Sequence, residues 1–268
     1  MSGGHRRAPA CGIVLVALLT VQACDVSLRS QQDPTQGATS DAAPAVLFSF
    51  SHVSSASVRT VVNQGRLGGR ATTMAVDGGR VVPTTGPRGT ALRFPGADSS
   101  ARHRRAILVY TSDDDGLDPG DGDLRLGADF KLDRVSQAGD DNGNNIVQRG
   151  LSRDPTQYKL QAEDGFASCR IAGDLGELTV KSTTRIKPGM WYHVTCARSG
   201  DEVSLSLQTL ERGAPVDREY RMGAIGSLTC KPSVPLVIGG KLTPDGDVVR
   251  RNSDQFNGVL DNVFVDIG

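Results

Sequence analysis

The chain has 268 residues, with 30 basic and 30 acidic side chains, so its formal charge at pH 7 is zero. A nucleic-acid-binding domain usually has a high isoelectric point and a basic surface, so the balanced charge argues against nucleic acid as a partner. The basic run at residues 102–105 is a local exception, and such runs are usually solvated loops. Aromatic residues make up only 4% of the chain, which leaves few rings for a sugar-binding surface.

Residues 1–23 have the layout of an export signal. A basic patch at residues 5–7 precedes an apolar run over residues 12–19, and Ala23 stands immediately before Cys24. A positive region, a short apolar region and a small residue are typical of a signal peptide. The apolar run is shorter than the roughly 20 residues that a membrane-spanning helix needs. The segment resembles a bacterial lipobox in which Cys24 is lipidated, although Gln22 is unusual there and a plain secretory signal is the alternative.

Residues 24–44 predict a tether. Residues 30–40 within this segment are polar, with almost nothing to bury, and such composition favours disorder and a flexible linker. The protein is therefore expected to be exported and lipid-anchored on the outer face of a bacterial membrane, or otherwise secreted. Residues 45–268 are expected to form one folded domain.

Short apolar runs separated by turn-forming residues follow in this domain, which predicts an all-β protein. Residues 203–208 alternate strictly between apolar and polar, and residues 199–202 before them are typical of a hairpin turn. The fold class is expected to be an antiparallel two-sheet sandwich or jelly roll. The expected strands cover residues 46–51, 90–94, 106–110, 124–132, 145–148, 157–162, 168–171, 177–181, 191–198, 203–208, 236–238 and 259–266.

The sequence predicts that two residues in these strands are buried. Trp191, the only tryptophan, lies in an apolar run that predicts a core position. Asp261 lies among apolar residues of the last strand, where a charge is costly unless it is paired or hydrogen-bonded.

Several motifs together resemble the LamG-like jelly rolls. They are GTALRF at residues 89–94, PGMWYHV at 188–194, LVIGG at 236–240 and FNGVLDNV at 256–263. Residues 145–150 (NIVQRG) and 159–161 (KLQ) resemble segments of secreted actinobacterial members of that family. The resemblance implies a concanavalin A-like sandwich of two antiparallel sheets over residues 45–268.

Three cysteines remain after Cys24, which allows at most one internal disulfide, and export makes a disulfide possible. The resemblance implies the pair Cys169 and Cys196, because the actinobacterial members have cysteines at both places. Closing a loop of this length would stabilise the fold by about 3 kcal/mol. Cys230 is expected to be a free, buried side chain, with pairing to another thiol as the alternative.

No catalytic constellation is evident in the sequence. Glucanases of this fold use an E-x-D-x-x-E triplet, which is missing here, and Glu163 and Asp164 are adjacent, so a strand would turn them to opposite faces. There is no nucleophile-elbow motif. His193 matches a structural family position, and His52 and His103 have no metal-ligand spacing.

Calcium is the one cofactor that the sequence suggests. Carboxylates cluster at residues 113–123, and calcium prefers such oxygens, so Asp113, Asp115 and Asp118 are candidates for a structural Ca²⁺ site. A solvated acidic loop is the alternative. LamG-like domains often hold one Ca²⁺, which supports the first interpretation without naming ligands.

The sequence therefore predicts a non-catalytic LamG-like module for carbohydrate binding or adhesion, with a glycan or a protein of the cell envelope as its partner. A divergent glycoside hydrolase or lyase on the same fold, or a purely structural envelope protein, are the alternatives. Fold analogy alone does not choose among them.

Overall fold

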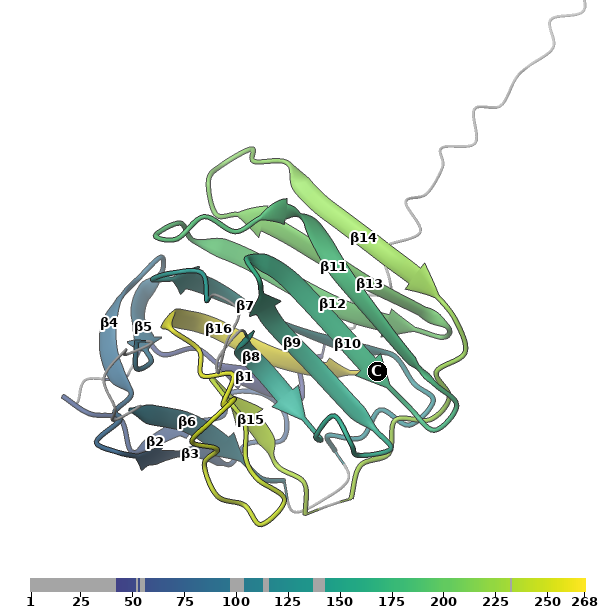
Figure 1. Ribbon diagram of the computed structural model, residues 1–268, viewed down its shortest axis with the longest axis horizontal. Coiled ribbons are helices and arrows are strands. Elements are labelled where there is room, and N and C mark those ends of the chain that lie inside the picture. Colours follow the sequence, from purple (N-terminus) through teal and green to yellow (C-terminus); the bar gives the residue numbers. More distant parts are fainter. Residues whose placement is uncertain are drawn as a thin grey trace, which may run out of the picture. The chain divides into compact units, whose positions relative to one another are not determined.

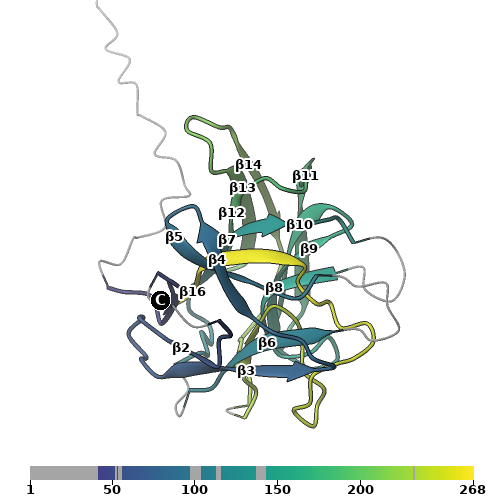
Figure 2. The same ribbon diagram turned by 90° about the vertical axis from the view of Figure 1, so that its left-hand side faces the viewer.

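The computed structural model describes residues 42–51, 53, 56–96, 104–112, 116–136, 143–231 and 233–268. Residues Ala38–Gly268 form one compact unit, and all the regular elements described in it are β-strands. The predicted antiparallel two-sheet sandwich is confirmed, because the strands form two eight-stranded sheets that lie in separate layers (Figures 1 and 2). In this part of the chain no helix is long and apolar enough to cross a membrane.

The first sheet, sheet A, contains the last strand near its middle. In spatial order its strands are β14 (Val216–Met222), β13 (Glu202–Thr209), β12 (Tyr192–Ser199), β7 (Leu124–Leu132), β16 (Gly258–Ile267), β5 (Gly89–Arg93) and β4 (Val82–Gly86), with β1 (Val46–Phe48) also paired to β16.

The second sheet, sheet B, packs against the first across the hydrophobic core. In spatial order its strands are β11 (Glu177–Arg185), β10 (Phe166–Ala172), β9 (Gln157–Glu163), β8 (Gly143–Arg149), β15 (Leu236–Ile238), β6 (Arg105–Tyr110), β3 (Arg70–Val76) and β2 (Thr60–Val62).

Three of the family-like motifs meet at one place between the sheets. The rings of Phe94 and Phe256 pack edge to face, with centroids 6.0 Å apart. A Cβ on Gly239 would lie 2.3 Å from the Phe94 ring, and a Cβ on Gly258 would lie 2.1 Å from the Lys131 carbonyl oxygen. Both glycines have a positive φ, at 85° and 151°, which L-residues with a side chain rarely adopt. The motifs are therefore packing features that join distant strands.

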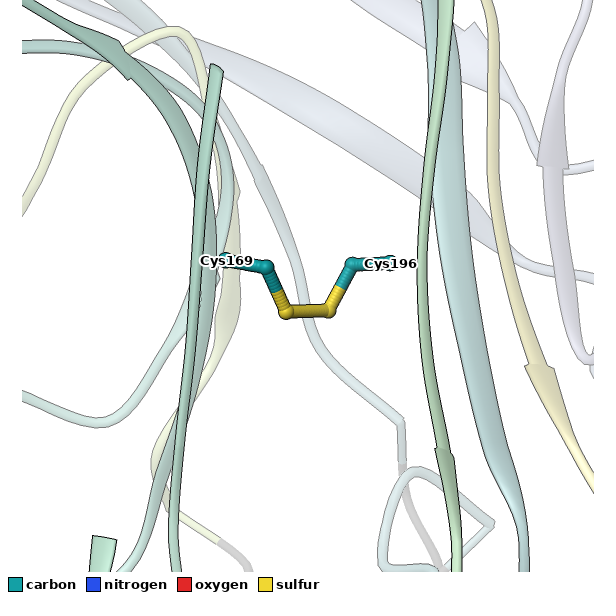
Figure 3. Close-up of a disulfide and its surroundings, with 2 residues drawn as sticks. All are labelled: Cys169 and Cys196. Atoms are coloured by element: carbon teal, nitrogen blue, oxygen red, sulfur yellow. A yellow bond between two sulfur atoms is a disulfide. The ribbon is translucent and has the colours of Figure 1, made fainter. Parts of the chain in front are cut away.

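The predicted disulfide is present and joins the two sheets. Cys169 of β10 and Cys196 of β12 are bonded across a sequence separation of 27, with their Cα atoms 5.8 Å apart. Figure 3 shows the bond crossing between the strand layers, and both residues are fully buried in the core. Cys230 is free and buried, as expected.

Candidate binding site

Most of the predicted calcium site cannot be located, because Asp113 and Asp115 lie outside the described residues, as do Cys24, His52 and His103. Asp118 lies in the interior, where its carboxylate pairs with the Arg149 guanidinium and accepts a hydrogen bond from the backbone N–H of Cys230 at 3.0 Å. Within the described ranges, no group of three or more His, Cys, Asp or Glu side chains could hold a metal ion.

A polar cluster instead lies on the outer face of sheet A, the side turned away from sheet B. Register places His193, Asp129 and Asp261 opposite one another on β12, β7 and β16. Residues directly opposite in neighbouring strands project on the same side of a sheet. Leu126, Ala128 and Phe130 alternate with these positions on β7 and face the core.

Asp129 is the centre of this cluster. Its side chain is fully buried, and one carboxylate oxygen lies 2.7 Å from His193 Nδ1. The other oxygen pairs with Arg88, in the β4–β5 turn, and accepts a hydrogen bond from Asn262 Nδ2 at 3.2 Å. His193 Nε2 lies 3.1 Å from Thr195 Oγ1. A buried carboxylate needs such partners, and it holds the partly exposed Arg88 and His193 in fixed orientations.

An aromatic and cationic stack continues the cluster. The rings of His193 and Phe264 are nearly parallel, with centroids 6.5 Å apart, and the Arg125 guanidinium lies 5.2 Å from the Phe264 centroid. Phe264 lies directly over Gly127, whose missing side chain makes room for the ring.

Gly127→Ala is expected to destabilise the fold by about 1–3 kcal/mol, the usual cost of overpacking. The new Cβ would lie 2.6 Å from both the Phe264 ring and the Val194 carbonyl oxygen, and the backbone atom cannot move aside easily. Thermal unfolding measures the change. Gly96→Ala is the control, because no atom lies within 4 Å of its Cβ position, and a loss of equal size there would contradict the packing explanation.

Asp261, noted in the sequence as a charge among apolar residues, is 3% exposed. It accepts a hydrogen bond from the backbone N–H of Asn262 at 2.8 Å. Asn262 has a positive φ of 49° and lies in a β-bulge, where the pairing of β16 with β7 shifts register. Burial raises the pKa of the Asp261 carboxyl above its usual range, and the Asp129 carboxylate adds to this rise.

This raised pKa predicts a pH-dependent stability. The folded state binds the Asp261 proton more tightly than the unfolded state, whose carboxyl has a pKa of about 4. The stability from this group is fully present below that value and is lost as pH rises through the folded pKa. Asp261→Asn mimics the protonated form, so it is expected to be more stable than the wild type at pH 7 and equally stable at pH 3. Urea unfolding at both pH values tests this, and an equal gain at both would contradict it.

A hollow of about 380 Å³ adjoins the cluster. Its walls come from the segment 42–47 and from side chains of the cluster and its neighbours, which are Arg88, Arg125, His193, Asn262, Phe264 and Asp266. A few convergent polar groups beside an apolar wall are typical of small-molecule sites, so the hollow can accept a ligand with several hydroxyl groups.

Further aromatic residues lie on the same face. The expectation that Trp191 belongs to the core is wrong: it is half-buried, and the ammonium of the outward-facing Lys131 lies 5.3 Å from its ring centroid. Tyr220, on the edge strand β14, is 68% exposed. Between Tyr220 and the cluster, the outward positions of β13 and β12 carry small side chains, which are Ser204, Ser206, Thr195 and Ala197.

A second cavity, of about 360 Å³, lies beside Cys230 and is lined largely by apolar residues and prolines. Burial raises the pKa of the Cys230 thiol, which lowers its thiolate content and its reactivity at neutral pH. Cys230 therefore fits a structural role better than a chemical one.

The chain is similar to known proteins in its fold, but not in its sequence. No protein-family model and no curated protein sequence matches the chain. The binding domain of Paraclostridial Mosquitocidal Protein 1 is similar with a TM-score of 0.53 and 13% identity, over 84% of this chain and 48% of that one. The botulinum neurotoxin serotype D/C VPI 5993 binding domain gives 0.50 and 7%, over 84% and 48%. The LG1-3 region of the laminin alpha2 chain gives 0.45 and 14%, over 54% and 27%.

The chain therefore spans less than half the length of each of these structures. At such low identity, the likeness to the first two shows the fold alone, which is a jelly-roll sandwich. The function must be argued from the outer face of sheet A.

Proposed function

We propose that the protein is a non-catalytic binding module that recognises a glycan of the cell envelope through the outer face of sheet A. The observation that carries this proposal is the buried Asp129, which fixes Arg88, His193 and Asn262 beside the Phe264 ring. Preorganised polar groups lose little conformational freedom on binding, which improves affinity. Rings and planar polar side chains side by side suit sugars, which combine apolar ring faces with hydroxyl groups.

Export is part of the same proposal. A signal over residues 1–23 with lipidation at Cys24 would place the module on the outer face of a bacterial membrane, in the manner of actinobacterial LamG-like lipoproteins. The inter-sheet disulfide supports this placement, because disulfides persist in oxidising compartments. Mass spectrometry of the native protein is expected to detect a diacylglyceryl group on Cys24. An unmodified chain that still carries residues 1–23 would refute the anchor.

The binding proposal is tested on arrays of envelope polysaccharides with the chain carrying Cys24→Ser, so that no lipid contributes. At least one glycan is expected to bind. His193→Ala and Tyr220→Ala are each expected to weaken that binding by about tenfold, equivalent to about 1.4 kcal/mol. Leu175→Ala is the matched control for Tyr220→Ala. Leu175 is about as exposed as Tyr220, but it lies in the β10–β11 turn, which belongs to sheet B. Equal binding by all variants would refute the site.

A second candidate, a glycoside hydrolase, is favoured by one observation. Asp129 and Asp261 are register partners on adjacent strands, and retaining glycosidases use two carboxyl groups about 5 Å apart. Both side chains are almost fully buried, however, and Asp129 is already shared by three partners, so we favour binding. Release of reducing sugar from a bound glycan, abolished by Asp261→Asn, would establish the hydrolase instead.

A further inference from the structure

The outer face of sheet B, on the opposite side of the sandwich, is polar across β8 to β11, whereas the outward positions Ile107 of β6 and Val237 of β15 belong to a small apolar cluster. One row across β8, β9, β10 and β11 consists of Asn145, Gln161, Ser168 and Lys181, which are paired in register. The neighbouring positions Leu160, Cys169 and Val180 face the core, so the row faces outward. The alternation therefore turns this row away from the sandwich interior.

Two side chains of this row are buried without satisfying their hydrogen-bonding capacity. Ser168 is 1% exposed and Asn145 is not exposed. The Ser168 Oγ and the Asn145 Oδ1 have no hydrogen-bond partner among the described residues. Folded proteins rarely leave buried polar atoms unpaired, because the lost hydrogen bond to water is not replaced. Asn145 lies beneath the segment 240–254, because its Nδ2 donates to the Gly240 carbonyl oxygen at 3.2 Å and its backbone N–H donates to the Asp254 carbonyl oxygen at 2.9 Å. A ligand that hydrogen-bonds to the Ser168 hydroxyl would remove the deficit at Ser168.

Positive charge is in excess around the same row. Lys159 and Lys241 share the single carboxylate of Asp254, at 3.1 and 3.0 Å. Lys181 pairs with Glu163 and Arg170 with Glu177. The remaining cation, Arg185, lies over the Phe166 ring at 4.8 Å.

This charge imbalance points to an anion. Among the described residues named for this face, five cations meet three carboxylates. Burial lowers the pKa of the Lys159 ammonium, and Asp254 opposes that shift. An approaching anion would favour the charged form of Lys159 further.

We propose that this face binds an anionic polysaccharide whose hydroxyl groups pair with Ser168 and whose carboxylate or phosphate groups lie against Lys159, Arg170 and Lys181. The strands β9 and β11, which carry Lys159 and Lys181, lie two strands apart in sheet B, which is about 10 Å at the usual strand spacing. That distance exceeds a single sugar ring and suits a polymer. The site is separate from the face of sheet A and does not depend on it.

The experiment measures binding of the chain carrying Cys24→Ser to immobilised polygalacturonate, poly(glycerol phosphate) and dextran. At least one of the two anionic polymers is expected to bind more tightly than dextran, and raising the salt concentration is expected to weaken that binding through charge screening. Binding of polygalacturonate alone identifies a carboxylate ligand, and binding of poly(glycerol phosphate) alone identifies a phosphate ligand.

Variants separate this site from the site on sheet A. Ser168→Ala is expected to weaken polymer binding by about tenfold, the effect of one lost hydrogen bond, without lowering the thermal midpoint, since the hydroxyl is unpaired. Lys181→Ala is expected to weaken it about fivefold by loss of one charge-assisted contact. Lys187→Ala, which removes a charge from an exposed loop, and His193→Ala should not change it. Failure of both anionic polymers to bind, equal binding of dextran, or unchanged binding by Ser168→Ala would overturn the proposal.

Discussion

Arg149→Met is expected to lower the free energy of unfolding by about 3–5 kcal/mol, the usual effect of removing one partner from a buried ion pair. The Arg149 and Asp118 side chains are only 1% and 5% exposed, so the variant leaves the Asp118 charge in the core without its cation. It also removes the hydrogen bond from Arg149 Nε to the Val234 carbonyl oxygen at 3.0 Å. Equilibrium unfolding in guanidinium chloride measures the loss.

The matched control for this prediction is Arg250→Met. Arg250 pairs with Asp77 at 2.6 Å, but its side chain is 61% exposed, so the same substitution should cost less than about 1 kcal/mol. In the double variant Arg149→Met with Asp118→Asn, part of the lost stability should return, because the uncompensated charge is gone. Equal losses of stability in the Arg149 and Arg250 variants would contradict the claim that burial makes the Arg149–Asp118 pair the more important of the two.

Removal of the inter-sheet disulfide is expected to cost about 3 kcal/mol, through the greater freedom of the unfolded chain. The double variant Cys169→Ala with Cys196→Ala removes the covalent link between the sheets and keeps small apolar side chains in the core. Its thermal midpoint should fall by several degrees, and addition of a reducing agent should lower the midpoint of the wild type but not of the variant.

Cys230→Ala is the control for the disulfide, because it removes a buried cysteine that has no covalent partner. It should lower stability far less than the double variant, and it should leave the sensitivity to reducing agent intact. A wild-type protein whose midpoint is insensitive to the reductant would contradict a stabilising role for the bond.

The buried strands could be predicted from the sequence because apolar residues and turn formers mark them clearly. The strands that were missed, β2, β3, β4 and β14, have weaker patterns. In β14 the sequence is VDREYRM with no residue fully buried, since it lies at one edge of sheet A. At such a position main-chain pairing rather than burial maintains the strand, and an apolar pattern is not required.

The candidate site was largely hidden in the sequence, because Arg88, Asp129, His193 and Asn262 come from four separate segments that only the sheet register brings together. Asp261 was identified as a charge that needed partners. The same signal was available for Asp129, a single acid within the apolar strand LRLGADFKL. An isolated charge in a buried strand was therefore the sequence feature that could have located the cluster.

Trp191 offers the most direct test of the central claim, that the outer face of sheet A binds a glycan. It is the only tryptophan in the chain and lies on that face, beside Lys131 and two residues from His193. Titration with an array-positive polysaccharide, followed by intrinsic fluorescence, is expected to give a saturable change that requires about tenfold more glycan in His193→Ala. Binding of the same glycan with an unchanged Trp191 signal, or an identical titration curve for His193→Ala, would contradict the claim.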